Sequence, residues 1–440
     1  MSKNHGRVAM LTIYVDHIST RLLYTLNFVL DQRGVTYHLC NDYIQFDRAE
    51  GIKLNYSDRY FENTPQLVPS SLLFEESVEE YEVSKNQFHK EECFCFNGTT
   101  DPLASIFFTL TRMEEYLTTE KDSLGRFPGK NSLLFQFNWH EKAMCDRWSI
   151  DFLSFLKERC GLTWNPRLEL IESVATFDID NAFAYLHKNT LRTQLAIAKD
   201  YLYNRKERLE DRKKVLAGEL KDPYDTFDFI QTLAMSGANV LVFWLLGDYG
   251  TYDKNISHLQ PDQRELIRKM SETLEIGVHG SYGSNESEYQ LGTEMGRLAE
   301  ITGQIATKNR QHFLMINLPL TYQALIRQQI TDDYTMGYAD IAGFRAGTAR
   351  VFNWFDLHKN ESTALRIHPF TYMDGTLHEY LKLSPAEAKQ KITSLYEEIC
   401  HYGGQFSYIW HNETIGDYAH WHGWKEVFSH TINLNQTDFI

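Results

Sequence analysis

The order of apolar and polar positions in the first part of the chain predicts a small module of strands and helices. Alternation over Val8–Val15 and Val35–Cys40 predicts two strands, and the run Ser19–Leu30 between them has the spacing of a helix. Further along, Asp101–Leu117 predicts an amphipathic helix and Leu133–Phe137 a strand. No glycine-rich loop of the kind that cradles phosphate follows these predicted strands. We therefore expect a small α/β domain without a nucleotide site.

From Leu168 onward the pattern changes to strands that alternate with helices. The apolar run Asn239–Leu246 is typical of a strand buried on both faces, and turn residues in Cys160–Pro166 mark the preceding break. We place the domain boundary there, with domains at residues 1–165 and 166–440. Repeated alternation argues for a parallel sheet, either open or closed as a barrel. The predicted strands are Leu170–Asp180, Asn239–Leu246, Glu275–His279, His312–Asn317, Met336–Asp340 continuing toward Arg345, Ala364–Phe370 and Phe406–His411, and the predicted helices include Asp262–Leu274, Glu286–Gln304 and Pro385–Cys400.

Composition narrows the range of partners. Among 440 residues, 59 Asp and Glu outnumber 44 Lys and Arg, which gives a formal net charge of -15. An acidic surface repels phosphate backbones, so we expect no nucleic-acid partner. A basic run, Arg205–Lys214, is interleaved with acidic residues and has the pattern of a solvated helix face. With 42% hydrophobic residues, the chain can bury a large core.

Cysteine spacing and the first residues indicate a compartment. The six cysteines show neither CxxC pairs nor the spacing of a disulfide framework. The apolar stretch within Met1–Asp16 is too short and too broken for a signal peptide, and no run reaches membrane-spanning length. We therefore expect a reducing, cytoplasmic setting and no membrane span, while the oligomeric state stays open.

Polar residues suited to chemistry follow the predicted strands at their C-terminal ends. In a barrel of parallel strands, this edge is where side chains from different strands converge without crowding the core. A scatter of satisfied polar residues would not favour one end of the strands so consistently. The candidates are Asp178, Asp180, Asp248, His279, His312, Arg345, Asp374 and His411.

The segment Thr176–Asp180 places two carboxylates on one face of a strand. Residues two apart on a strand share a face, so Asp178 and Asp180 point the same way while Phe177 and Ile179 pack behind them. Two ionised carboxylates repel each other. A bound cation relieves that repulsion and leaves the second carboxylate available as a base. Taken alone, the pair fits a loop-capping or Ca²⁺-binding role equally well.

Two histidines offer further ligands for such a cation. His279 directly follows an apolar strand and precedes a glycine-rich turn, and His312 begins the next predicted strand. With one carboxylate they form a set of two imidazoles and one oxygen ligand. This set suits zinc or another borderline divalent metal with one position open for water. The competing interpretation of each histidine is a capping or core residue.

A third histidine ends the last predicted strand. His411 is a candidate partner of Asp374, because a carboxylate can hold a histidine protonated until it gives its proton to a leaving group. The rival pair His420 and His422 has a spacing that could chelate a metal. It lies among residues typical of a solvent-exposed tail, so we interpret it as structural.

Five segments occur in an order that resembles a known family. TFDID, VHGSYGS, GFRAGT, YMDGT and IWHNE are similar, in this order, to the five motifs of the polysaccharide deacetylase (NodB-like) superfamily, across roughly Ile171–Asp417. The resemblance is to a divergent bacterial branch with an N-terminal module of unassigned function, whose signature TRMEEYL and DSLGRF resemble (Thr111–Leu117 and Asp122–Phe127). It implies a distorted (β/α) barrel of NodB type preceded by a smaller α/β N-terminal domain.

The resemblance also implies roles for individual residues. Asp178 corresponds to the catalytic base and Arg345 to the arginine that orients it. His411 corresponds to the general acid, braced by Asp374. The implied metal ligands begin with Asp180 and His279.

Two positions depart from the family pattern. The second histidine of the family HxxxH motif falls on Gly283, which has no side chain to bind a metal. Either His312 replaces it, or Ser281 or Ser284 helps through water, or the site has lost its ion. We favour His312. The family proline after the arginine is Ala346, so the groove is expected to differ in shape.

Two classes of function remain open from the sequence. The first is a metal-dependent hydrolase that removes an N- or O-acyl group from a sugar or glycan. The second is a catalytically inactive carbohydrate-binding protein with the same cleft. Base, acid and their orienting residues occur together, which favours the enzyme, since binding alone does not need them. A glycosidase with two separated carboxylates and no metal is a third option.

Overall fold

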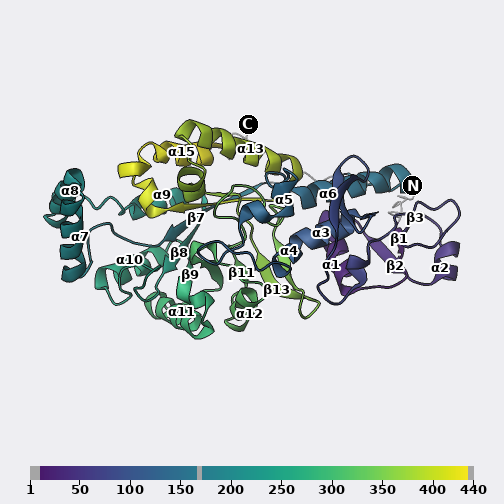
Figure 1. Cartoon of the computed structure of the whole chain (residues 1–440), viewed down its shortest axis with the longest axis horizontal. Helices are drawn as coiled ribbons and strands as arrows, with labels where there is room; N and C mark the ends of the chain where they lie inside the picture. The colour runs from purple at the N-terminus through teal and green to yellow at the C-terminus, as the bar shows by residue number, and fades with distance from the viewer. Residues whose placement is uncertain (1–9, 166–170, 435–440) are drawn as a thin grey trace, which may run out of the picture.

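The computed structural model describes residues 10–165 and 171–434 and has a mixed α/β fold (Figure 1). Near the N-terminus, three parallel strands lie in the order β2-β1-β3 and α1 packs its apolar side into the core. The predicted helix Ser19–Leu30 is confirmed, and Ser19 caps it by accepting a hydrogen bond from the backbone N–H of Leu22. The elements are β1 (Leu11–Tyr14), α1 (Thr20–Val29), β2 (Tyr37–Cys40), α2 (Tyr43–Arg48) and β3 (Ile52–Asn55).

The chain then forms a small antiparallel sheet and several helices. Two predictions are corrected here. Asp101–Leu117 is not one helix, because Arg112 has a left-handed backbone (φ 55°) between α3 and α4. Leu133–Phe137 is a helix rather than a strand, since the Ser132 side chain accepts from the backbone N–H of Leu134 and starts a helical turn. The elements are β4 (Val83–Gln87), β5 (Glu92–Phe96), β6 (Thr99–Thr100), α3 (Pro102–Leu110), α4 (Met113–Tyr116), α5 (Leu133–Gln136) and α6 (Met144–Phe155).

A nine-stranded sheet forms the centre of the remaining chain. Its order is β12-β13-β11-β10-β9-β8-β7-β15-β14, and every neighbouring pair is parallel except β12 with β13. The C-terminal ends of the parallel strands therefore meet at one edge. The strands are β7 (Glu172–Ile179), β8 (Asn239–Leu245), β9 (Glu275–Gly280), β10 (Lys308–Gln311), β11 (Asp332–Asp333), β12 (Phe352–Asp356), β13 (Glu361–Ile367), β14 (Tyr372–Met373) and β15 (Gln405–His411).

One short segment links β13 to β14, the strands at the two ends of the parallel part of the row. Residues 368–371 are all that separate β13, which pairs with β11, from β14, which pairs with β15. Along the segment, the backbone N–H of Phe370 donates to the carbonyl of Met336 at 3.1 Å, and that of Thr371 donates to the carbonyl of Ser407 at 2.9 Å. The strands at the two ends of the parallel part of the row, β13 and β14, are thus consecutive in the chain.

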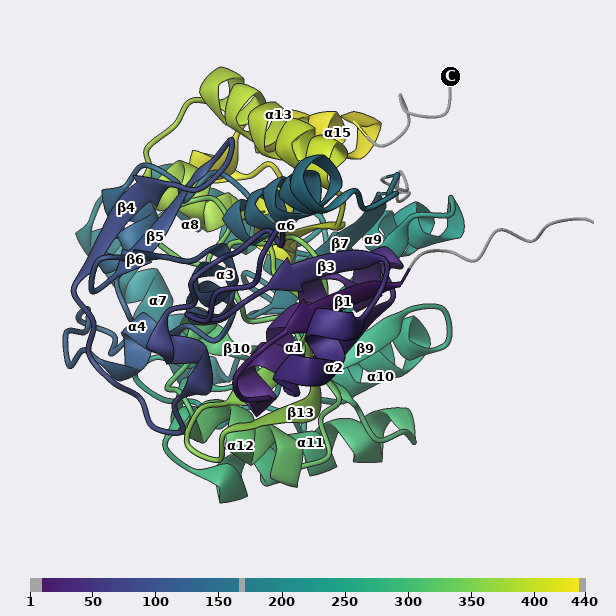
Figure 2. The ribbon, with the colours of Figure 1, turned by 90° about the vertical axis from the view of Figure 1, so that its right-hand side faces the viewer.

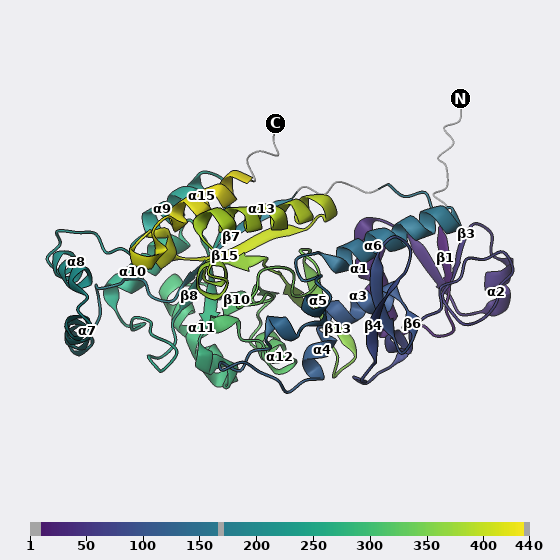
Figure 3. The same ribbon diagram turned by 45° about the horizontal axis from the view of Figure 1, so that its top comes forward.

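Helices lie along both sides of the sheet. Figure 1 shows α13 and α15 together on one side and α10, α11 and α12 on the other, while α7 and α8 project at the end far from β1. Figure 3 gives the same arrangement from a second direction, and Figure 2 looks onto the N-terminal end, with β1 and α1 in front. In the described part of the chain, no helix is long and apolar enough to cross a membrane. The helices are α7 (Thr190–Leu202), α8 (Lys206–Leu216), α9 (Phe227–Met235), α10 (Pro261–Ser271), α11 (Glu288–Thr302), α12 (Leu320–Arg327), α13 (Pro385–Tyr402), α14 (Asn412–Ile415) and α15 (Trp424–Leu434).

Two strand predictions in this half are wrong. His312–Asn317 is not a strand: β10 ends at Gln311, and a short turn follows in which Phe313 has a left-handed backbone (φ 58°). Strand β10 has the sequence KNRQ. Its last three side chains are buried and form hydrogen bonds within the protein, so the strand has no apolar pattern that would predict it. Met336–Asp340 is irregular, because β11 comprises only two residues and lies before it.

Candidate metal centre and active site

The two carboxylates of the TFDID segment lie at the C-terminal end of β7. This strand is flanked by β15 and β8, so its end opens onto the edge where the parallel strands meet. Phe177 and Ile179 are buried in the main core, as the alternation predicts. Asp178 is buried, while Asp180 is partly exposed. Among the described residues, Asp178 Oδ1 and Asp180 Oδ1 are buried oxygens without a hydrogen-bond partner.

His279 approaches Asp180 from β9. Its Nδ1 lies 2.8 Å from the carbonyl oxygen of Arg310, an acceptor, so this nitrogen carries the ring proton. Its Nε2 lies 3.2 Å from Asp180 Oδ1 and is the ring nitrogen that would face a bound cation. Fixing one ring nitrogen by a hydrogen bond is how proteins orient a histidine that binds metal through the other nitrogen.

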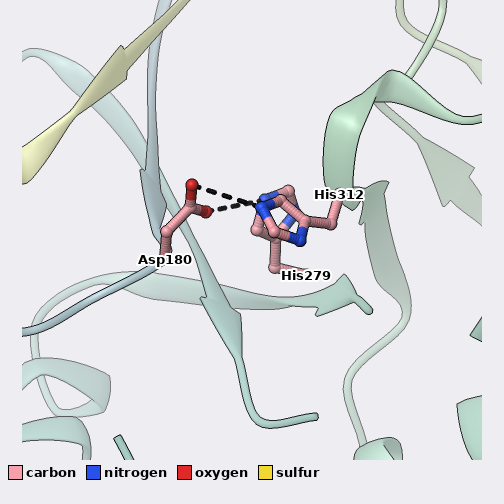
Figure 4. Close-up of side chains that lie close together, drawn as sticks. All are labelled: Asp180, His279 and His312. Atoms are coloured by element: carbon pink, nitrogen blue, oxygen red, sulfur yellow. Dashed lines mark ion pairs between the residues drawn. The ribbon is translucent and has the colours of Figure 1, made fainter. Parts of the chain in front are cut away.

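His312 approaches the same carboxylate from the turn after β10. Its Nδ1 lies 2.7 Å from Asp253 Oδ1, and its Nε2 lies 3.3 Å from Asp180 Oδ2. The left-handed turn at Phe313 follows it directly and carries the chain away from the sheet. Figure 4 shows the Asp180 carboxylate facing both imidazole rings. The expected placement of His312 beside Asp180 is thus found, although it lies after a strand rather than within one.

Electrostatics at this cluster favour the charged carboxylate. Burial alone would raise the pKa of Asp180, but His312, His279 and His411 hold it well below its usual range. Burial would lower the pKa of His312, but Asp180 and Asp253 raise it to about 9. The protein thus gathers positive charge around one carboxylate, and a cation would serve the same purpose.

The geometry fits a divalent ion. One ligand atom from each of Asp180, His279 and His312 lies within 4.8 Å of the others. Zinc–nitrogen distances of about 2.0–2.1 Å in a tetrahedron give edges of about 3.3–3.4 Å between ligand atoms. His279 Nε2 lies 3.2 Å from Asp180 Oδ1 and His312 Nε2 lies 3.3 Å from Asp180 Oδ2, so each histidine approaches a different oxygen of the carboxylate at about the length of one such edge. Two imidazoles and one carboxylate leave a fourth position for water or substrate.

His411 completes the edge from β15. Its Nδ1 lies 2.8 Å from Asp374 Oδ1, and its backbone N–H donates to Asp374 Oδ2 at 2.8 Å. Its Nε2 points toward the cluster, 3.9 Å from Asp180 Oδ2. Burial would lower the pKa of His411, but Asp374 and Asp180 raise it well above its usual range. The expected pair of His411 with Asp374 is present, and it places a protonated histidine beside Asp180.

The arginine beside the expected base is Arg310, which differs from the expectation for Arg345. Arg345 donates to Glu115 Oε1 and Oε2 at 3.0 and 2.6 Å and to the carbonyl of Gly337 at 2.9 Å. Arg310, from β10, has Nη1 3.8 Å from Asp178 Oδ2. The physical reason is that Glu115, in the N-terminal region, draws the Arg345 guanidinium away from β7.

The other residues weighed in the sequence lie outside the ligand set. The side chain of Ser281 bonds Glu294, and that of Ser284 donates to the carbonyl of Ser281 and to Gln311. A side chain at Gly283 would meet the Gln290 amide, with its Cβ 2.8 Å from Nε2. Asp248 pairs with Arg297, and His422 is exposed. None of these supplies the ligand that the HxxxH motif lacks at Gly283.

A cavity of about 170 Å³ lies over the cluster. A cavity of about 880 Å³ beside α7 is larger but is not lined by Asp178, Asp180 or any of the three histidines, so the candidate site is identified by its residues and not by its size.

Four residues of the site were not predicted from the sequence. Arg310 and Asp253 lie in segments without a motif; Glu413 lies within IWHNE, and burial raises its pKa. Arg126 lies within DSLGRF. The smaller cavity is lined by Arg126, Asp178, Asp180, His279, Gln311, His312, Phe313, Leu314, Ala339, Met373, Gly375, Glu379, Tyr380, His411, Glu413 and Trp421.

Comparisons with known proteins give a partial context. Residues 11–161 match DUF7033, a family of unknown function. No curated protein matches. A structure from Mycobacterium smegmatis, described as a polysaccharide deacetylase, is similar with a TM-score of 0.39 and 15% identity over 61% of this chain and 85% of that one. A polysaccharide deacetylase from Bacillus cereus gives a TM-score of 0.25 and 10% identity over 55% and 80%. Likenesses this low carry no argument about the function of this chain.

Proposed function

We propose that this protein is a metal-dependent hydrolase that removes an N- or O-acyl group from a sugar or glycan. The observation that carries the proposal is the common orientation of three histidines. His279, His312 and His411 each fix Nδ1 on an acceptor and turn Nε2 toward Asp180, beside the carboxylate of Asp178. The carbohydrate part of the proposal rests on the order of the five sequence segments.

In this proposal Asp180, His279 and His312 hold a divalent metal, with zinc favoured. When bound, such an ion lowers the pKa of its water and polarises the acyl carbonyl. Asp178 takes the proton of the attacking water, since its Oδ1 has no partner among the described residues. Arg310 places a positive charge beside this carboxylate, with Nη1 3.8 Å from Asp178 Oδ2. The residues thus divide into ligands and a base.

The leaving group receives its proton from His411. Its Nε2 faces the cluster, while Asp374 accepts from both its ring and its backbone and so fixes the ring plane. A histidine kept protonated by a buried carboxylate can give its proton to a departing amine or alkoxide and be recharged by solvent. This role places the acid on the opposite side of Asp180 from His279.

The proposal includes the fold that carries the site. We infer that residues 166–440 form a distorted (β/α) barrel, in which the segment from β13 to β14 joins the two ends of the parallel part of the strand row. Residues 1–165 then form the N-terminal α/β domain. What supports this is the parallel order of the strands together with the short span between β13 and β14.

The test is metal content together with release of acetate. Purified protein supplied with Zn²⁺ should retain about one ion per chain and release acetate from N-acetylglucosamine oligomers. His312→Ala should lose both the metal and the activity, while His420→Ala serves as a control, because His420 is exposed and lies outside the cluster. Asp178→Asn should keep the metal and lose the activity.

The outcomes separate the hydrolase from its alternative. Unchanged metal content in His312→Ala would remove this residue from the ligand set. Glycan binding without metal and without hydrolysis would favour the inactive binding protein, which is suggested by Gly283 at the position of a family ligand.

A further inference from the structure

The DSLGRF segment of the N-terminal region forms a closed turn that reaches the metal centre. Asp122 Oδ1 accepts from the backbone N–H groups of Leu124 and Arg126, both at 2.9 Å, and Asp122 Oδ2 accepts from Arg126 Nε at 2.8 Å. Gly125 has φ 86°, a left-handed backbone that glycine adopts without strain. The turn therefore fixes both the backbone and the guanidinium of Arg126.

From this turn, Arg126 enters the cavity over the metal cluster. It is 8% exposed and lines the cavity with Asp178, Asp180 and the three histidines. Its Nη1 donates to the carbonyl of Phe313 at 3.2 Å, and its Nη2 donates to the hydroxyl of Tyr380 at 3.1 Å. Phe313 directly follows the ligand His312, so the guanidinium lies next to the backbone that positions this ligand.

The hydrogen-bond capacity of Arg126 is not used up by the protein. A guanidinium has five N–H groups. The protein contacts described take one on Nε, one on Nη1 and one on Nη2. One N–H therefore remains on each terminal nitrogen, and paired donors of this kind match the two oxygens of a carboxylate or neighbouring hydroxyls.

We propose that Arg126 forms a subsite for oxygen atoms of the substrate next to the acyl group that is cut. This inference rests on the proposed function. Its ligand is a sugar oxygen, from a carboxylate or from a pair of hydroxyls, and the N-terminal region thereby supplies one wall of the substrate site. Arg126 is a positioning residue: it holds the sugar while Asp178 and His411 move protons.

A second hydrogen bond offers a way to loosen the turn without changing the charge of Arg126. The hydroxyl of Tyr282, three residues beyond the ligand His279, donates to the carbonyl of Leu124 at 3.1 Å. Tyr282→Phe removes this hydrogen bond and leaves the Arg126 charge in place. This variant is the matched control, because it shows how much substrate binding is lost when the turn is loosened but the charge is kept.

The experiment measures KM and kcat for Arg126→Gln, Arg126→Lys and Tyr282→Phe in the Zn²⁺-loaded full chain. A hydrogen bond to a charged group contributes about 1.5–3 kcal/mol, so we expect Arg126→Gln to raise KM by about 10-fold to 100-fold. Its kcat should change less than threefold (roughly) and its metal content should not change, because the proton-transfer residues remain. Arg126→Lys should recover part of the loss, and Tyr282→Phe should behave like the unaltered protein.

Two substrates identify the oxygen. Neutral N-acetylglucosamine oligomers and oligomers that contain N-acetylmuramic acid differ in a carboxylate. A loss confined to the acidic oligomers assigns the carboxylate, and an equal loss on both assigns hydroxyls. Loss of metal from Arg126→Gln, an unchanged KM, or an equal effect of Tyr282→Phe would overturn the subsite.

Binding measured without turnover keeps this inference apart from the proposed function. Trp421 lines the same cavity, so quenching of tryptophan fluorescence by the oligomers reports binding directly. If the unaltered protein binds oligomers but releases no acetate, the hydrolase fails and Arg126→Gln still must weaken binding. If it cleaves them and Arg126→Gln binds equally well, only the subsite fails. No binding by the unaltered protein overturns both.

Discussion

Arg345 and Arg310 are both buried in the C-terminal half, yet their charges are satisfied to different extents. Arg345 has three hydrogen bonds, two of them to the carboxylate of Glu115. Arg310 is fully buried and donates from Nη2 to Thr176 Oγ1 at 2.8 Å, while its Nε and Nη1 have no hydrogen-bond partner among the described residues. Its guanidinium lies over the rings of Phe243 and Phe370.

The difference separates a structural charge from one that serves a site. Buried donors are nearly always bonded in folded proteins, and leaving one unbonded costs about 1–3 kcal/mol. Glu115 and Arg345 satisfy each other and join the N-terminal region to the segment after β11. Arg310 instead keeps unbonded buried donors, at a cost in stability, next to Asp178, where its positive charge can contribute to the proposed reaction. We therefore expect the two arginines to fail in different ways when they are replaced.

The largest expected effect is on folding when Arg345 is changed to Met. Removing Arg345 takes away positive charge that compensates the buried carboxylate of Glu115. Breaking a buried ion pair in this way destabilises the folded state by about 3–5 kcal/mol. Chemical denaturation should show this loss, while the activity per folded molecule should stay within about twofold of the unaltered protein. If Arg345→Met were as stable as the unaltered protein but inactive, Arg345 would have a role in the active site, and the proposed difference between the two arginines would be wrong.

Acid should weaken the same ion pair. Burial would raise the pKa of Glu115, but Arg345 and Arg112 lower it to about 2. A folded-state pKa below the unfolded value means that this stabilisation is present above about pH 4.5 and is lost as the pH falls toward 2. Its size is about 3 kcal/mol for a shift of this order.

Glu115→Gln provides the control for that pH dependence. It should be less stable at pH 7 and should lose less stability than the unaltered protein between pH 4.5 and 2. Denaturant midpoints measured across this range check the expectation. Parallel acid profiles for the two proteins would show that Glu115 does not carry the effect.

Changing Arg310 to Met should affect activity more than folding. Because Arg310 makes one side-chain hydrogen bond and lies 3.8 Å from Asp178, its replacement should cost less stability than the loss of the closely bonded Arg345. Losing the charge beside Asp178 should lower kcat by about a hundredfold, which corresponds to about 2.7 kcal/mol. Arg310→Lys keeps the charge and should recover part of the rate. A large loss of stability with unchanged kcat would make Arg310 structural as well.

The smallest effect is the stabilisation of the metal site by its own ion. Zn²⁺ at ten times its dissociation constant should stabilise the protein by about 1.4 kcal/mol, seen as a higher Tm. The shift should vanish in His312→Ala and persist in Arg345→Met, since that residue is not near the cluster. An equal shift in His312→Ala would place the ion elsewhere.

The sequence predicted the site better where apolar strands lead into it. Strands β7, β8, β9 and β15 are apolar runs, so the polar residues at their ends could be read directly. His312 was proposed as a ligand although its strand was misplaced, because KNRQ in β10 has no apolar signal. The motif order could not separate Arg310 from Arg345. Which of the two arginines lies beside Asp178 depends on Glu115, which binds Arg345 and lies 230 residues before it in the chain.

The N-terminal region was harder to interpret for the same reason. Helix α3 forms the first part of the predicted helix Asp101–Leu117, but it is buried on all sides rather than amphipathic. Nothing in DSLGRF shows that Arg126 crosses to the cavity. The contact with Phe313 spans 187 residues, and only tertiary packing brings the two together. Short-range patterns predict elements, while these contacts depend on how elements are placed.

The pairing of β7 with β15 determines when the candidate site can first form during synthesis of the chain. These neighbours are the first and last long strands of the sheet, and seven residue pairs join them, from Gln405 with Glu172 to His411 with Asp178. During synthesis, Asp178 leaves the ribosome more than two hundred residues before His411 follows it. Closing so long a loop is slow, and a chain cut short before β15 has an exposed edge on β7. Incomplete chains would therefore expose an unpaired strand edge that is prone to aggregate, and they would lack His411, so the site can form only once β15 is in place.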